Sequence, residues 1–154
     1  MPREQKHHLN RILVTVTLAN SNDRALFAAG KLAKKKIRVK QIEAVVDTGA
    51  VMSLLPQDLV EALGLVVMDR TTVQLANDQR IELERAGPLT LTVVGRTMHT
   101  DCLIGPPGCE ALLGQLVMEG LALICDPGRR TLTVRPESPY RPSFKLKKLD
   151  LMQR

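Results

Sequence analysis

Ala44-Val45-Val46-Asp47-Thr48-Gly49-Ala50 carries more structural information than any other stretch of this chain. Asp47 stands between two apolar runs, and a carboxylate in such a place is costly to bury unless it is hydrogen-bonded or shares a proton. Gly49 lets the backbone turn sharply, and the Thr48 hydroxyl can reach a backbone group of a neighbouring strand. These residues suit a carboxylate at the floor of a cleft, although a strand that ends in a polar turn uses the same residue types.

Two further segments extend this pattern. Leu112-Leu113-Gly114 resembles the hydrophobic-hydrophobic-Gly element that braces the active-site loop of aspartic proteases, and Leu103-Ile104-Gly105-Pro106 resembles the strand and Gly-Pro turn of the retroviral enzymes. The stretch around Asp47 resembles the active-site strand of the same enzymes, and the order matches between Arg11 and Val134. The chain therefore resembles a retropepsin-like aspartic protease (clan AA) of the bacterial type. The resemblance implies an all-β fold, a retropepsin-like closed barrel with one or two short helices, whose half-site is completed by dimerisation.

The resemblance also implies how the active site is built. The chain holds one Asp-Thr-Gly and no Asp-Ser-Gly, whereas pepsin-like enzymes carry two such motifs in one chain. A second copy related by a two-fold axis would complete the site, with Asp47 of each copy as the catalytic residue. The other expected site residues support the carboxylate pair (Thr48, Gly49, Leu113 and Gly114) or contact substrate (Gly49, Ala50, Val51, Ala76, Asn77 and Asp78).

The expected hairpin at 73–83 occupies the place of the family's flap, and an ordinary surface hairpin is the alternative. Its tip, 75–79, lacks the glycines of retroviral flaps and the aromatic residue of pepsin-like ones. Val51 and Gln115 stand where retroviral enzymes have an acidic residue and an arginine that form an ion pair, so both charges are absent together. Val51 and Met52 would then line an aliphatic pocket, or else belong to the core.

Length and charge suggest how the chain is organised. Its 154 residues fit one folded domain at 11–135, with a flexible segment at 1–10 and a basic, Pro/Lys-rich tail at 136–154. The net charge of +6 is typical of a solvated surface, and also of nucleic-acid or membrane-surface contact. Because aromatic residues make up only 2% of the chain, we do not expect nucleic acid as a partner.

No cofactor or metal is expected. Three cysteines without a CxxC spacing argue against a disulfide framework and against zinc, and the adjacent His7 and His8 near a terminus usually bind nothing specific. Reduced thiols and the lack of a signal peptide predict a cytoplasmic protein. No run of about 18 apolar residues is present, so we expect no spanning helix and no membrane partner.

Hydrophobic periodicity predicts many short strands and a few short helices. The strands are expected at 12–18, 37–46, 65–68, 72–75, 79–84, 89–94, 97–104, 121–125 and 131–135, with a bulge or bend near Lys40. Short helices are expected at 24–29, after Pro56, and at 115–119.

Three functions follow from these observations. The leading expectation is an aspartic endopeptidase that hydrolyses peptide bonds with a water activated by a pair of Asp47 carboxylates from two subunits. The alternative is a catalytically silent retropepsin-fold module for peptide binding or assembly. A third gives the basic tail the main role as a nucleic-acid anchor with steep salt dependence. The intact Asp-Thr-Gly-Ala favours the enzyme, because little besides chemistry repays a buried carboxylate pair.

Overall fold

The computed structural model describes residues 11–147. The segment expected to be flexible (1–10, which includes His7 and His8) and the last part of the tail (148–154) lie outside the described residues. In chain order the elements are β1 (Leu13–Asn20), α2 (Ser21–Ala28), η1 (Lys34–Lys36), β2 (Val39–Val46), β3 (Leu54–Pro56), α3 (Gln57–Ala62), β4 (Val66–Gln74), β5 (Arg80–Val93), β6 (Arg96–Gly105), β7 (Leu112–Leu113), α4 (Gln115–Gly120), β8 (Leu123–Asp126) and β9 (Thr131–Val134).

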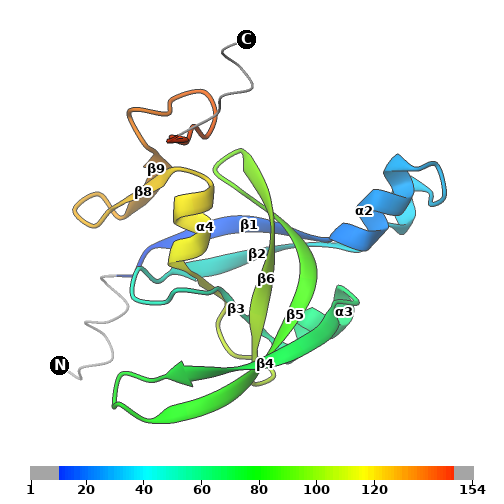
Figure 1. The fold of residues 1–154 in the computed structure, drawn as a ribbon, viewed down its shortest axis with the longest axis horizontal. Coiled ribbons are helices and arrows are strands. Elements are labelled where there is room, and N and C mark those ends of the chain that lie inside the picture. The colour runs from blue at the N-terminus through cyan, green and yellow to red at the C-terminus, as the bar shows by residue number, and fades with distance from the viewer. Residues whose placement is uncertain (1–10, 148–154) are drawn as a thin grey trace.

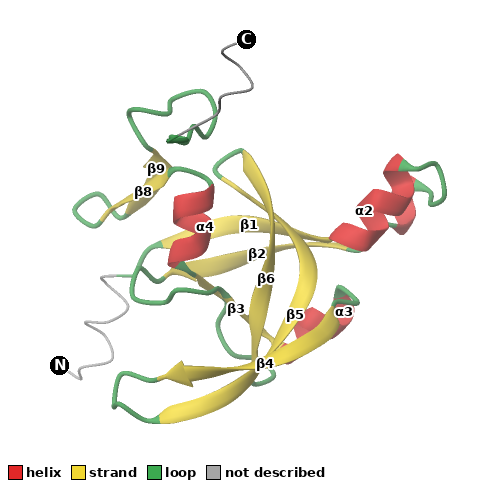
Figure 2. Cartoon of the chain, in the orientation of Figure 1, coloured by secondary structure: helices red, strands yellow, loops and turns green. Residues whose placement is uncertain are grey.

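The fold is mostly β, as the sequence indicated (Figure 2). Seven strands form one mixed sheet in the order β1-β2-β7-β3-β6-β5-β4, and β8 pairs with β9 in a separate two-stranded sheet. β5 also pairs with β1, so the large sheet curls back towards its own first strand (Figure 1).

The expectation of a closed barrel is wrong in detail, because the sheet is only nearly closed. β3 and β7 pair through the single residue pair Leu54↔Leu112, and β4 continues the sheet beyond β5. Residues 11–147 also hold three short α-helices, α2, α3 and α4. They lie close to the three places that hydrophobic periodicity predicted, whereas the resemblance implied only one or two.

Two strands are longer than their sequence pattern suggested. β4 spans the two runs expected at 65–68 and 72–75, and β5 spans those expected at 79–84 and 89–94. Each strand contains a register shift, between Val67 and Asp69 in β4 and between Ala86 and Leu89 in β5. Such an irregularity interrupts the alternation of side chains without ending the strand. The bulge expected near Lys40 is not found, since β1 and β2 pair without a register shift.

One hydrophobic core fills the curled sheet. Its fully buried members come from strands at opposite ends of the chain, and Leu113 of β7 is among them. β7 therefore lies in the core between β2, with which it runs parallel, and β3. This arrangement matters for the site because both β2 and β7 end at the Asp47 loop.

The start of the tail is fixed to the body by one buried arginine. The Arg96 guanidinium donates hydrogen bonds to the carbonyl oxygens of Leu121 (2.8 Å), Ala122 (3.1 Å) and Ser138. Beyond this point Phe144 and Leu146 are exposed, so they do not pack along the body.

Candidate active site

Asp47 lies directly after β2, where two parallel strands position it. β2 and β7 pair through Val45↔Leu112 and Val46↔Leu113, and the Asp47 backbone N–H continues the pairing by donating to the Leu113 carbonyl oxygen at 3.0 Å. The residue is half-buried. Asp47 is therefore held by the core of the sheet, although its carboxylate retains access to solvent.

The Asp47 carboxylate is oriented within its own turn. Its Oδ1 atom accepts a hydrogen bond of 3.0 Å from the Gly49 N–H, and the Ala50 N–H donates to the Asp47 carbonyl oxygen at 3.2 Å. A Cβ atom on Gly49 would lie 3.3 Å from the same Oδ1 atom. A side chain at position 49 would therefore crowd the carboxylate, which explains the small residue after Thr48.

Gly114 packs directly against the far side of the Asp47 loop. A Cβ atom at this position would lie 2.5 Å from the Met52 carbonyl carbon and 2.8 Å from the Val51 carbonyl oxygen, so only glycine fits without moving the loop. The Gly114 N–H donates to the buried hydroxyl of Ser53 at 3.0 Å.

The start of α4 holds the same loop through its backbone. The Gln115 N–H donates to the Ala50 carbonyl oxygen at 2.7 Å, and the Leu116 N–H donates to the Val51 carbonyl oxygen at 3.0 Å. The first N–H groups of a helix have no partner within the helix, so these bonds satisfy both the helix and the loop. Leu113 and Gly114 were expected at the site, but Ser53 was not. A single hydroxyl side chain within the apolar run 51–55 was the only sign of it in the sequence.

A cleft of about 880 Å³ separates this loop from β4 and the following turn. Six of the expected site residues line it: Asp47, Gly49, Ala50, Val51, Ala76 and Asp78. The rest of this wall comes from β4, the residue after it and β6. Val73, Gln74 and Leu75 belong to the expected flap hairpin, whereas Thr71, Thr72 and Leu103 were not expected at the site. The hairpin of β4 and β5 thus forms one side of the cleft, as expected of a flap.

Four expected site residues do not line this cleft: the bracing residues Leu113 and Gly114, described above, and also Asn77 and Thr48. The Asn77 side chain turns to its own hairpin, where it bonds with the Gln79 backbone N–H at 3.0 Å. Thr48 is exposed and lines a second hollow of about 560 Å³, together with residues of α4 and β8. Within residues 11–147 the Thr48 side chain forms no hydrogen bond, so its hydroxyl is available on the outer side of the loop.

The cleft is acidic in a protein that is basic as a whole. Among the described residues that line it, Asp47 and Asp78 are the only ionisable ones, whereas the chain carries a net charge of +6. Asp78 adopts a φ of +63° at the hairpin tip, and its Oδ1 atom accepts a hydrogen bond of 3.1 Å from the Gln74 amide. The second carboxylate is therefore held in place above the cleft.

The remaining wall of the cleft is largely aliphatic. Val51 is 66% exposed and Met52 is half-buried, and both line the cleft. The interpretation of Val51 as a core residue is therefore wrong, and the aliphatic-pocket interpretation holds. Gln115, which occupies the other place of the missing ion pair, donates its side-chain amide to Glu119 at 2.9 Å.

The three cysteine thiols are not activated as nucleophiles. Burial raises the pKa of the Cys102 thiol to about 12, and burial also raises the pKa of Cys109 and of Cys125. All three are free of disulfides. Within the described part of the chain, no three His, Cys, Asp or Glu side chains converge to hold a metal ion. No helix in that part is long and apolar enough to cross a bilayer.

The chain matches the sequence profile of a known protein family. A sequence profile of the family described as "gag-polyprotein putative aspartyl protease" matches residues 33–119, more than half of the chain. The matched span includes the Asp47 loop, the hairpin over the cleft and Gly114. No curated protein matches the chain.

Proposed function

Because this chain belongs to the gag-polyprotein aspartyl protease family, we propose that it is an aspartic endopeptidase whose active site combines Asp47 from two copies of the chain. The observation that carries this proposal is the placement of Asp47 at the edge of a peptide-sized cleft, fixed by Gly49 and by the tightly packed Gly114. A carboxylate that is fixed at the edge of a cleft can act on a bound substrate, whereas a carboxylate in an ordinary surface turn cannot.

The proposed reaction needs two carboxylates that face each other. Two such groups cannot comfortably ionise together, so they share one proton, as is familiar for aspartic proteases. The charged carboxylate removes a proton from a bound water, which attacks the peptide carbonyl carbon, and the protonated carboxyl group supplies a proton as the leaving amine departs. Because this reaction needs one charged and one protonated carboxyl group, activity should have a bell-shaped pH profile.

The exposed side of the Asp47 loop supports a two-chain site. One chain supplies one Asp-Thr-Gly, and the Thr48 hydroxyl forms no hydrogen bond within residues 11–147. A second copy packed on this side would bring its own Asp47 and Thr48 to the two-fold axis. Sedimentation should then give about twice the chain mass of 17.0 kDa. We further propose that the dimer works in the cytoplasm.

The lining of the cleft supports an extended peptide as substrate. The peptide backbone would lie between the Asp47 loop and β4, with main-chain groups pairing as in an added strand. Aliphatic side chains of the peptide would contact Val51, Met52 and Leu103. A basic side chain of the peptide would face Asp78, which is the only other ionisable residue that lines the cleft within residues 11–147.

One comparison tests the proposed activity directly. Purified wild-type protein and the Asp47→Asn variant would be incubated with a diverse peptide library, and the cleavage products would be read by mass spectrometry. Asp58→Asn is a matched control, because it makes the same chemical change at a carboxylate that bonds the Gly108 N–H, outside the cleft. Asp47→Asn should lower cleavage by several orders of magnitude, whereas Asp58→Asn should leave it nearly unchanged.

Two results would count against the enzyme. If Asp47→Asn cleaves as well as wild type, Asp47 is not catalytic. If neither protein cleaves any peptide but both bind peptides equally well, the chain is a peptide-binding module of the same fold.

A further inference from the structure

The connection between β1 and β2 projects from the curled sheet as a separate arm. We define the α2 arm as residues 21–38, which comprise α2, the turn η1 and the segments that join them to the sheet. Figure 1 shows α2 extending away from the sheet, on the side opposite to the β8–β9 hairpin. The arm therefore contributes little to the core, and Asp23 is its only buried residue.

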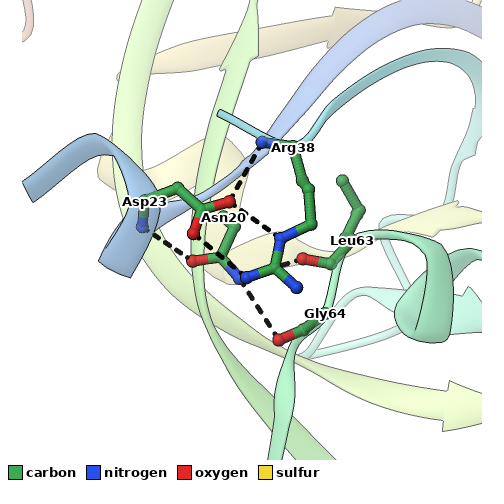
Figure 3. Close-up of polar contacts among 5 residues, drawn as sticks. All are labelled: Asn20, Asp23, Arg38, Leu63 and Gly64. Atoms are coloured by element: carbon green, nitrogen blue, oxygen red, sulfur yellow. Dashed lines mark hydrogen bonds and ion pairs between the residues drawn. The ribbon is translucent and has the colours of Figure 1, made fainter. Parts of the chain in front are cut away.

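The base of the arm is firmly fixed to the body. Asp23 accepts three hydrogen bonds from Arg38: one from the backbone N–H (3.0 Å) and two from the guanidinium (2.8 and 3.0 Å). The Asn20 side chain accepts from the Asp23 N–H and donates to the carbonyl oxygens of Leu63 and Gly64, at 2.9 and 3.2 Å (Figure 3). These bonds join both ends of the arm to the turn after α3, so the arm is a built projection rather than a loose loop.

The surface of the arm carries charge of one sign. No acidic residue occurs from position 24 to position 42. The arm carries five cations besides Arg38: Arg24, Lys31, Lys34, Lys35 and Lys36. None of these five forms an ion pair within residues 11–147, whereas arginines on the β4–β5 hairpin pair with neighbouring carboxylates. The hairpin has the mixed charge of an ordinary solvated surface, and the arm does not.

Two large apolar side chains are exposed on the same arm. Leu26 is 42% exposed and Phe27 is 43% exposed, and both lie on α2. The chain has only three aromatic residues, and Phe27 is the one that lies in a helix or strand. Of the five cations only Arg24 lies on α2 itself, and the four lysines follow at 31–36. Exposed apolar side chains in a segment that is rich in Lys and Arg suit contact with the interface of an anionic bilayer.

We propose that the α2 arm docks on the surface of an anionic lipid bilayer. The five free cations would face the lipid headgroups, and Leu26 and Phe27 would enter the interface. A nucleic acid would satisfy the cations equally well, but it offers no apolar environment for the Leu26 side chain. The sequence led us to expect no membrane partner because it has no spanning segment, and a surface contact requires none. Two arms on a dimer would strengthen the attachment.

A vesicle assay with matched variants tests the arm. The full chain would be mixed with phosphatidylcholine vesicles with and without phosphatidylserine, and the bound fraction measured by flotation. The arm variant is K34Q/K35Q/K36Q, and its control is R141Q/K145Q/K147Q, which removes the same charge from the exposed tail. Wild type should bind only the vesicles that contain phosphatidylserine, and added salt should release it. The arm variant should bind at least about tenfold more weakly, and the tail control within about threefold of wild type.

The apolar pair is tested in the same assay. Leu26→Ser/Phe27→Ser should weaken binding to phosphatidylserine vesicles, whereas Leu13→Ser, at an even more exposed leucine on β1, should not. Unchanged melting temperatures would show that the variants are folded. The proposal is overturned if wild type does not bind the anionic vesicles or if the arm variant and the tail control lose binding equally. It is also overturned if the arm variant loses binding to a single-stranded RNA oligonucleotide while no protein binds vesicles.

Discussion

The backbone N–H of Gly114 donates a 3.0 Å hydrogen bond to the Ser53 hydroxyl, and both residues are buried. The bond joins the start of α4 to the end of the Asp47 loop, across a contact so close that position 114 admits no side chain. The Ser53 carbonyl oxygen also accepts the Leu103 N–H at 2.9 Å. Ser53 therefore ties the loop to two separate parts of the sheet, and we assign it a positioning role for Asp47.

Ser53→Ala should weaken both stability and activity. The variant leaves the buried Gly114 N–H without a partner, and such a loss costs about 1–3 kcal/mol. Because the loop that carries Asp47 then becomes less fixed, kcat should fall while KM changes little. Urea unfolding and steady-state kinetics would measure the two effects. Ser143→Ala removes the hydroxyl of an exposed serine that bonds Ser138 and serves as the control. Equal kcat values for the two variants would show that Ser53 does not position Asp47.

Asp78→Asn should change which peptides are cleaved rather than how fast the best neutral peptide is cleaved. If Asp78 faces a basic side chain of the substrate, the variant should lower kcat/KM for peptides with Lys or Arg at the preferred position by about tenfold, the scale of one charged contact. Paired peptides that differ only by Lys and Gln would give the measurement. Asn77→Ala alters the neighbouring residue, which does not line the cleft, and should leave the preference unchanged. A Lys/Gln preference that Asp78→Asn does not alter would contradict this assignment.

The Asp23–Arg38 pair should make the stability of the fold depend on acid pH. Hydrogen bonds from the Arg38 guanidinium lower the pKa of Asp23 from its ordinary value. Because the pKa is lower in the folded state, the contribution of Asp23 is complete above the unfolded value of about 4 and is lost as pH falls through the folded pKa. At neutral pH, Asp23→Asn should therefore unfold more easily than wild type, by about 2 kcal/mol.

The sign of this dependence is checked by comparing the two proteins along a pH series. The difference in free energy of unfolding between wild type and Asp23→Asn should shrink as pH falls from about 6 to about 3. Glu84→Gln, an exposed carboxylate with no partner within residues 11–147, should show a small and nearly constant difference. A difference between wild type and Asp23→Asn that grows towards acid pH would contradict the inferred pKa shift.

Short-range sequence patterns predicted the parts of the site that are local. The Asp47 turn could be read from the run 44–50, because glycine and the carboxylate interact within three residues. Leu113 and Gly114 were found only through resemblance, since the close contact between Gly114 and Met52 joins residues far apart in the chain. The hairpin tip was expected as a turn, but its sequence did not indicate that Asp78 would line the cleft while Asn77 would not.

Other features depend on packing that no local pattern encodes. Thr71 and Thr72 of β4 were missed as cleft residues because a register shift after Val67 disturbs the alternation that would have shown one long strand. The barrel was expected to close fully, yet β3 and β7 are joined by the single residue pair Leu54↔Leu112. Whether these two strands pair depends on tertiary packing, because they are far apart in the chain. The basic residues of the α2 arm could be seen in the sequence. That the arm projects from the sheet could not be predicted from it (Figure 1).

Mixing wild-type and Asp47→Asn chains tests most directly whether one active site uses Asp47 from two copies. The two proteins would be unfolded and refolded together at a fixed total concentration, and peptide cleavage would be measured against the wild-type fraction. If a site needs both carboxylates, only dimers of two wild-type chains are active, so an equal mixture should retain about one quarter of the wild-type rate. A rate that falls in proportion to the wild-type fraction, to about one half, would show that each chain works alone and would contradict the two-chain site.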